Sequence, residues 1–219
     1  MREILIACEM LRDELELAME QTQKKPKIMW LEKGLHNEPK NLHKVLQETI
    51  NQAAQTYDHI LLGMAYCGGA MNGIGSRTAT VVVPRFDDCI RLLLALEQGK
   101  PNSCDCHCLY FTKQWMISDC YIVRELEKYC RTYGEKRGKR IMRSMLANYR
   151  GLHLLDTGAY DISDFAETAA KDAQQLGLEY GQQPGTSRIL EKLLLHQFDD
   201  EFCVALPGQT LTQGQFLCC

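Results

Sequence analysis

The chain has no apolar run long enough to cross a membrane. None of its 219 residues lies in a stretch that approaches the roughly 20 apolar residues of a membrane helix. The opening MREILIACEMLRDELEL lacks the pattern of a signal peptide, because the apolar run is short and acidic residues follow at once. A net charge of −3 gives no general attraction to nucleic acid or to a membrane surface. These absences predict a cytoplasmic protein with no nucleic-acid partner and no membrane partner.

The common signatures of phosphate binding and hydrolysis are also missing. The stretch YCGGAMNGIG (residues 66–75) has neither G-x-G-x-x-G spacing nor the Lys-Ser/Thr of a P-loop, and it leads toward another strand. No Ser–His–Asp order and no HExxH stands out. Gly68 and Gly69 are candidate cofactor-binding residues because they let the backbone turn and leave space beside the thiol of Cys67. The alternative is a plain glycine turn around a buried cysteine.

Short apolar runs alternate with helical patterns along the chain. Strands are predicted at residues 3–8, 27–32, 59–65, 78–84, 108–112, 152–158, 178–182 and 202–207. Their continuous apolar character favours an α/β fold, a mostly parallel sheet with helices on both faces. Residues 1–209 form either one α/β domain or two Rossmann-like lobes, 1–119 and 150–209, bridged by helices at 120–149. Residues 210–219 are expected to be a mobile tail that ends in Cys218 and Cys219.

Eleven cysteines make metal binding or thiol chemistry the main functional expectation, with inert buried cysteines as the alternative. Ligands in parallel sheets bind at the carboxyl ends of the strands. Four consecutive predicted strands place a cysteine or a histidine at that edge, namely Cys8, His36, Cys67 and Cys89. Three thiolates and an imidazole suit zinc. Three cysteines alone would suit a [4Fe-4S] cluster whose fourth iron binds substrate.

Two further groups of residues are candidates for the same cleft. Asp87 and Asp88 follow the fourth strand and are candidate acid–base residues, and Asp88 could also orient a metal ligand. The segment PGTSR opens a predicted helix, so Thr186, Ser187 and Arg188 are candidates for binding a small anionic substrate. Ordinary turn and cap chemistry is the alternative for this segment.

The stretch NSCDCHCLYF is a second cysteine-rich feature. In an extended chain Cys104, Cys106 and Cys108 would face one way and His107 the other. The stretch is expected to be a second metal site, a redox relay or an exposed loop. The basic residues between 131 and 143 lack interleaved aromatics, which predicts a solvated helix face.

Several motifs together resemble one uncharacterised family. These are GLHNEPKNL, LLGMAYCGGAMNGI, VVVPRFDDCIRLLLALE, LYFTKQW, LLDTG, PGTSRILEKLL and DDEFCVALPGQ, and the likeness runs from about Ile4 to Gln209. They resemble the bacterial and archaeal family called domain of unknown function 1638. The resemblance implies that Cys8, His36, Cys67 and Cys89 match recurring positions, and it associates the family with corrinoid-dependent methyltransferases of anaerobes. The chain departs from the pattern at Asp87, where a histidine is expected, and in its CDCHC insert.

The residues and the resemblance together predict a metal–thiolate protein, with zinc or an iron–sulfur cluster, that acts on a small molecule. Zinc would suit methyl transfer to a thiol, and a cluster with an open iron would suit a dehydratase-like or reductive step. The alternative is a non-enzymatic accessory protein that handles a metal or a corrinoid for a methyltransferase. A corrinoid is expected only through such a partner.

Overall fold

A computed structural model describes residues 2–98 and 104–216. The strands are Glu3–Cys8 (β1), Ile28–Leu31 (β2), His59–Gly63 (β3), Thr80–Pro84 (β4), Cys108–Phe111 (β5), Gly151–Asp156 (β6), Glu179–Pro184 (β7) and Phe202–Ala205 (β8). The α-helices are Arg12–Thr22 (α1), Pro39–Ala53 (α2), Cys89–Leu93 (α3), Lys113–Met116 (α4), Ile122–Tyr133 (α5), Glu135–Met145 (α6), Ser163–Leu176 (α7), Arg188–Leu194 (α8) and Gln213–Phe216 (α9). Short 3-10 helices lie at Glu9–Leu11 (η1) and Leu35–Asn37 (η2). No helix in the described part of the chain is long and apolar enough to span a membrane.

The chain divides into two compact units. Unit 1 comprises Met1–Asn102 and Thr186–Cys219, and unit 2 comprises Ser103–Gly185. Unit 2 is thus an insertion in the sequence of unit 1. The helices at 120–149, expected as a bridge between lobes, lie within unit 2 as α5 and α6. Side chains from both helices join the apolar core of that unit, which also contains Leu152 and Leu154 of β6.

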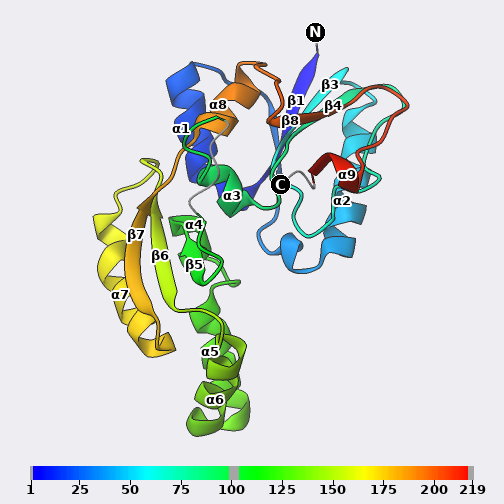
Figure 1. Cartoon of the computed structure of the whole chain (residues 1–219). Helices are drawn as coiled ribbons and strands as arrows, with labels where there is room; N and C mark the ends of the chain where they lie inside the picture. The colour runs from blue at the N-terminus through cyan, green and yellow to red at the C-terminus, as the bar shows by residue number, and fades with distance from the viewer. Residues whose placement is uncertain (1, 99–103, 217–219) are drawn as a thin grey trace. The chain divides into compact units, whose positions relative to one another are not determined.

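Unit 1 is built on a five-stranded sheet with the order β2-β1-β3-β4-β8. The first four strands are parallel, and β8 runs antiparallel to β4 at one edge. Figure 1 shows α1 and α8 on one face of this sheet and α2 on the other. The predicted α/β fold with a mostly parallel sheet and helices on both faces is confirmed.

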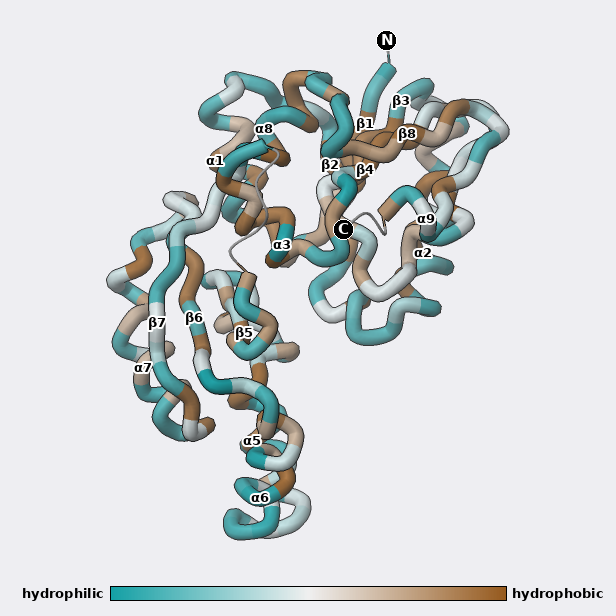
Figure 2. The backbone as a smooth tube through the Cα atoms, viewed as in Figure 1, coloured by the Kyte–Doolittle hydropathy of each residue, from teal (hydrophilic) through white to brown (hydrophobic). Residues whose placement is uncertain are grey.

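Burial on both faces explains why the strands of unit 1 are continuously apolar. In β1, Ile4 and Ile6 pack into the core on the α2 face. The alternate residues of the strand, Leu5 and Ala7, are also fully buried. Helix α2 presents Leu42, Leu46, Ile50 and Ala53 to that core, at the spacing of an amphipathic helix. Figure 2 shows the strands of this sheet as a hydrophobic centre.

The C-terminal segment of unit 1 is part of the same core. Within residues 210–219, predicted as a tail, Leu211 and Phe216 are buried. The ring of Phe216 stacks on Tyr66 with 4.6 Å between centroids. Aromatic contact and burial therefore hold this segment against the turn that follows β3. Cys218 and Cys219 lie outside the described residues.

Unit 2 contains a three-stranded parallel sheet with the order β5-β6-β7. One face carries Phe111, Leu152 and Leu154, which pack with apolar residues of α5, α6 and α7. The edge strand β7 is polar, as its pale to teal colour in Figure 2 shows, and none of its residues is fully buried. A polar edge strand is one of the ways in which sheets avoid pairing with other chains.

Candidate metal centre

The candidate ligands of unit 1 lie around the carboxyl ends of β1, β3 and β4. Cys8 is the last residue of β1 and packs against the core on the α2 face, as Cys67 does. Strand β3 ends at Gly63, two residues earlier than predicted, and the chain continues to Cys67 in a turn. The amides of Tyr66 and Cys67 donate to the carbonyls of Phe86 and Asp87, both at 2.9 Å. These bonds hold the segments after β3 and β4 side by side beyond the ends of the strands.

The glycine-rich stretch is a turn that presents Cys67. Cys67 itself has a φ of 48°, and Gly68 and Gly69 continue with φ of 67° and 95°. Such left-handed backbone is easy for glycine and strained for cysteine. Strained residues persist where the surrounding structure imposes them, often at functional sites. The cofactor-binding role of Gly68 and Gly69 stays a prediction, since the structure gives them a conformational role.

The turn is docked on the start of α2. A side chain at Gly68 would lie 3.2 Å from the Cγ of Pro39, the first residue of α2. One turn further along α2, Nδ1 of His43 donates to the carbonyl of Ala70 at 2.9 Å. Because η2 directly precedes α2, this contact also brings the segment that carries His36 toward the Cys67 turn.

Cys67 and Cys89 are in direct contact. Their Sγ atoms lie 3.9 Å apart, and either thiol can donate to the other. Cys89 is the first residue of α3, and its position is set by Asp88, whose carboxylate caps the helix by accepting from the amide of Arg91 at 2.7 Å. The hydrogen bond with Cys67, followed by burial, raises the pKa of the Cys89 thiol well above its ordinary value. A bound cation would oppose this shift, because it favours the thiolate form of Cys89.

His36 is in the form that ligates metals. It lies in η2 and is partly buried. Burial lowers the pKa of its imidazole from the ordinary value. The ring is therefore neutral at pH 7, and the neutral ring is the one that binds metal ions.

The four predicted ligands are not gathered as one set in the structure. Across residues 2–98 and 104–216, the ligand atoms of only one group of three or more His, Cys, Asp or Glu residues lie within 4.8 Å of one another, and that group is in unit 2. Neither Cys8 nor His36 therefore lies within 4.8 Å of both sulfurs of the Cys67–Cys89 pair. The structure brings two of the four into contact and places the other two on neighbouring segments.

Asp87 and Asp88 lie at the surface next to Arg91. Their side chains are about half exposed, at 49% and 51%, and lie 3.7 and 3.9 Å from the guanidinium. Asp88 also caps α3 through its other oxygen. Their acid–base role stays a prediction, and the cap gives Asp88 a structural role.

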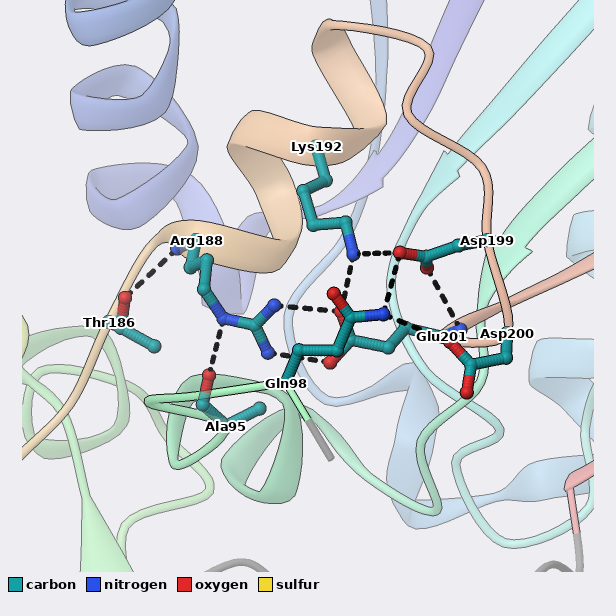
Figure 3. A network of polar contacts seen from close by, with 8 residues as sticks. All are labelled: Ala95, Gln98, Thr186, Arg188, Lys192, Asp199, Asp200 and Glu201. Carbon is teal, nitrogen blue, oxygen red and sulfur yellow. Dashed lines mark hydrogen bonds and ion pairs between the residues drawn. The ribbon is translucent and has the colours of Figure 1, made fainter. Parts of the chain in front are cut away.

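The segment Thr186–Arg188 is occupied by contacts within unit 1 (Figure 3). The guanidinium of Arg188 donates to both carboxylate oxygens of Glu201, at 2.7 and 2.6 Å, and to the carbonyl of Ala95 at 2.9 Å. The hydroxyl of Ser187 donates to Glu191 at 2.6 Å, and the hydroxyl of Thr186 accepts from the amide of Arg188 at 3.0 Å. Turn chemistry, part of the alternative, accounts for the Thr186 contact, and Arg188 is engaged by Glu201 and Ala95. Anion binding stays a prediction.

The strained conformation of Cys67 predicts an unusual order of stabilities. We expect metal-free Cys67→Gly to be more stable than Cys67→Ala by about 1 kcal/mol, because only glycine is unstrained at positive φ. Urea unfolding of both variants measures the difference. Cys8, at φ −76°, is the matched control, and there the alanine variant should be the more stable one. Equal stabilities at position 67 would contradict the strain.

The comparisons with known proteins give a family and nothing closer. No curated protein and no solved structure matches the chain. A family model described as protein of unknown function (DUF1638) matches residues 30–194. The match includes His36, Cys67 and Cys89 and begins after Cys8, so it is narrower than the likeness from Ile4 to Gln209. Because the matched segment is well over half of the 219 residues, the chain belongs to the DUF1638 family.

Proposed function

We propose that the protein is a metal–thiolate protein in which Cys67 and Cys89 bind one metal ion. The observation that supports this most directly is the distance of 3.9 Å between their sulfurs. Two thiolates bound to one tetrahedral zinc at 2.3 Å lie about 3.8 Å apart. The pair thus has the spacing of two ligands of a single zinc ion.

This spacing favours a single ion over an iron–sulfur cluster. In a [4Fe-4S] cluster the cysteines bind different irons, so their sulfurs lie farther apart than two sulfurs on one ion. Cys67 and Cys89 would have to separate to bind a cluster, against the backbone hydrogen bonds that hold the two turns together. Of the two expected cofactors we therefore propose zinc.

Cys8 and His36 are the proposed remaining ligands. Cys8 packs against the same core as Cys67, and His36 precedes the helix on which the Cys67 turn is docked. A thiol and a neutral imidazole are both zinc ligands. If only one of them binds, the fourth position is open to a small molecule. Thr186, Ser187 and Arg188 are left out of this proposal, because their polar groups are engaged within unit 1.

We propose a thiol as the small-molecule substrate. Zinc with an open position acts as a Lewis acid that lowers the pKa of a bound thiol or water. The resemblance to the family associates it with corrinoid-dependent methyl transfer, for which an activated thiol is a suitable methyl acceptor. The residues of the chain would hold and orient this thiol beside Cys67.

Metal analysis of protein purified without oxygen tests the centre. Compared with wild type, Cys67→Ser and Cys89→Ser should each lose one equivalent of zinc per chain, and Cys8→Ser and His36→Gln should weaken its binding. Cys130→Ser is the matched control, because a serine hydroxyl can still donate to the carbonyl of Glu135 as the thiol does. Unchanged zinc in folded Cys67→Ser and Cys89→Ser would overturn the proposal. If the purified protein is brown and contains iron and sulfide, the cofactor is an iron–sulfur cluster and not zinc.

A second candidate function is the accessory role, in which the protein passes a metal or a corrinoid to a methyltransferase. Cys67 is partly exposed and Cys106 in unit 2 is exposed, which favours this role because handover needs accessible thiols. Exchange with a chelator separates the two functions. A centre that loses its zinc rapidly supports handover, and a centre that retains it supports catalysis.

A further inference from the structure

The cysteine-rich segment before β5 is a turn and is not extended. The amide of Cys108 donates to the carbonyl of Asp105 at 3.0 Å, which closes a tight turn over residues 105–108. As a result Cys106 is exposed and Cys108 is buried. The expectation that Cys104, Cys106 and Cys108 face one way is corrected, because it depended on an extended chain. His107 was expected to face away from the cysteines, but its imidazole lies near the thiol of Cys106.

Three different donors come together in this turn. The carboxylate of Asp105, the thiol of Cys106 and the imidazole of His107 have ligand atoms that all lie within 4.8 Å of one another. Ligands of one zinc ion at bond lengths of 2.0–2.3 Å are about 3.3 to 3.8 Å apart. Small side-chain rotations therefore bring the three donors to one ion. We propose that Asp105, Cys106 and His107 bind a divalent transition-metal ion in unit 2, separate from the centre in unit 1.

The surroundings orient His107 as a ligand. Its Nδ1 lies 2.9 Å from the carbonyl oxygen of Asn148. A carbonyl oxygen only accepts, so Nδ1 carries the hydrogen and Nε2 carries the lone pair. A backbone carbonyl on the other ring nitrogen is the usual support of a metal-binding histidine.

Asp105 is held equally firmly. Its Oδ1 accepts from the amide of His107 at 2.9 Å, and Arg150 donates to Oδ2. Its own amide donates to the hydroxyl of Tyr110 at 2.8 Å. Each oxygen of this carboxylate has a second lone pair, which is available to bind a metal.

The donor set and Arg150 together indicate which metal binds. Calcium and magnesium depend on several oxygen ligands, and here only one carboxylate is present and a guanidinium is paired with it. A thiolate and an imidazole instead select zinc and its neighbours among the transition metals. Three protein ligands on an exposed turn leave a fourth position open to water or to a donor from another molecule.

Cobalt titration of the full chain tests the site. The Cys67→Ser/Cys89→Ser variant is used as the background, so that failure of the unit 1 centre is distinguishable from failure of this one. We expect one equivalent of Co²⁺ to bind with a thiolate-to-cobalt absorption band, and zinc to displace it. Added Cys106→Ser should abolish the band, and added His107→Gln should weaken binding at least tenfold. Cys130→Ser should change neither.

The cobalt affinity of Arg150→Gln distinguishes a metal site from a turn that has only a structural role. The guanidinium of Arg150 repels a cation and competes with it for the carboxylate of Asp105. Its removal should therefore make cobalt bind several-fold more tightly. If the background variant does not fold, the same changes in wild type should remove one of two bound equivalents of zinc. Cobalt binding that is absent from the folded background, or unaffected by Cys106→Ser and His107→Gln, would overturn the proposal. A band that depends on Cys104 instead of Cys106 would also overturn it.

Discussion

Glu201→Ala is expected to destabilise the protein by about 3 kcal/mol, because it leaves two partly buried cations without their shared carboxylate. Arg188 reaches Glu201 through two hydrogen bonds, and Lys192 reaches the same carboxylate at 2.6 Å. The side chains of Glu201 and Lys192 are only 12% exposed, and that of Arg188 is 23% exposed. The network joins α8 to the loop before β8 and to the segment after α3 (Figure 3). Thermal or urea unfolding measures the loss.

The same carboxylate makes stability depend on acid pH. Burial raises the pKa of Glu201, but the hydrogen bonds from Arg188 and Lys192 outweigh it, so the folded-state pKa lies below the ordinary value. A carboxyl with a depressed pKa stabilises the fold above its unfolded pKa, and this contribution is lost as the pH falls through the folded value. Wild type should therefore lose stability below about pH 4. The free energy of unfolding of Glu201→Gln should be lower than that of wild type at pH 7, and it should fall less steeply as the pH decreases.

Glu135→Gln is the control for the ion pair. Glu135 pairs with Lys139 one helical turn away, and both side chains are well exposed. Exposed pairs of this kind contribute little. Unfolding of Glu135→Gln should match wild type at every pH. If Glu201→Ala also behaves like wild type, the network does not stabilise unit 1.

Gly75→Ala is expected to destabilise the protein by about 3 kcal/mol, since the added methyl group collides with backbone. Its Cβ would lie 2.2 Å from the carbonyl oxygen of Gln209 and 3.0 Å from the Cα of Thr210. Gly75 and Thr210 form an antiparallel bridge, and the side chain of Gln47 bonds both the amide and the carbonyl of Gly75. Relief requires the C-terminal segment to move away from the glycine-rich turn. Urea unfolding measures the cost.

Gly214→Ala is the matched control for this substitution. Gly214 also lies in the C-terminal segment, in α9. In the described part of the chain, no atom outside its neighbours and its own helix backbone comes within 4 Å of an added Cβ. Alanine favours helix over glycine, so stability should be unchanged or slightly higher. A loss in Gly214→Ala as large as that in Gly75→Ala would show that the collision at Gln209 is not the cause.

Local sequence pattern was enough for most of the secondary structure. Each of the eight predicted strands has a counterpart among β1 to β8, and every strand end lies within two residues of the predicted one. After β4, the helical pattern of residues 87–98 produces a helix only at Cys89–Leu93. Apolar runs and helical spacing are properties of neighbouring residues, so they can be read without the fold. The fold class follows from them.

The candidate centre was predictable only in part. The meeting of Cys67 and Cys89 follows from two neighbouring parallel strands that end at the same edge. The turn at 105–108 could not be inferred from alternation, because the bond that closes it competes with an extended chain. The carbonyl that orients His107 comes from Asn148, 41 residues away, and no local signal points to it.

The sequence by itself determined that this protein is an α/β member of its family, with a cysteine at the end of β1 and further cysteines after β3 and β4. The tertiary structure alone decided that β8 closes the sheet in the antiparallel direction, that residues 103–185 form a unit of their own, and that Arg188 binds Glu201. The physical reason is range. Backbone propensity and hydrophobic period act between neighbours, whereas strand partners and the partners of buried charges are selected by packing among residues that are distant in the chain.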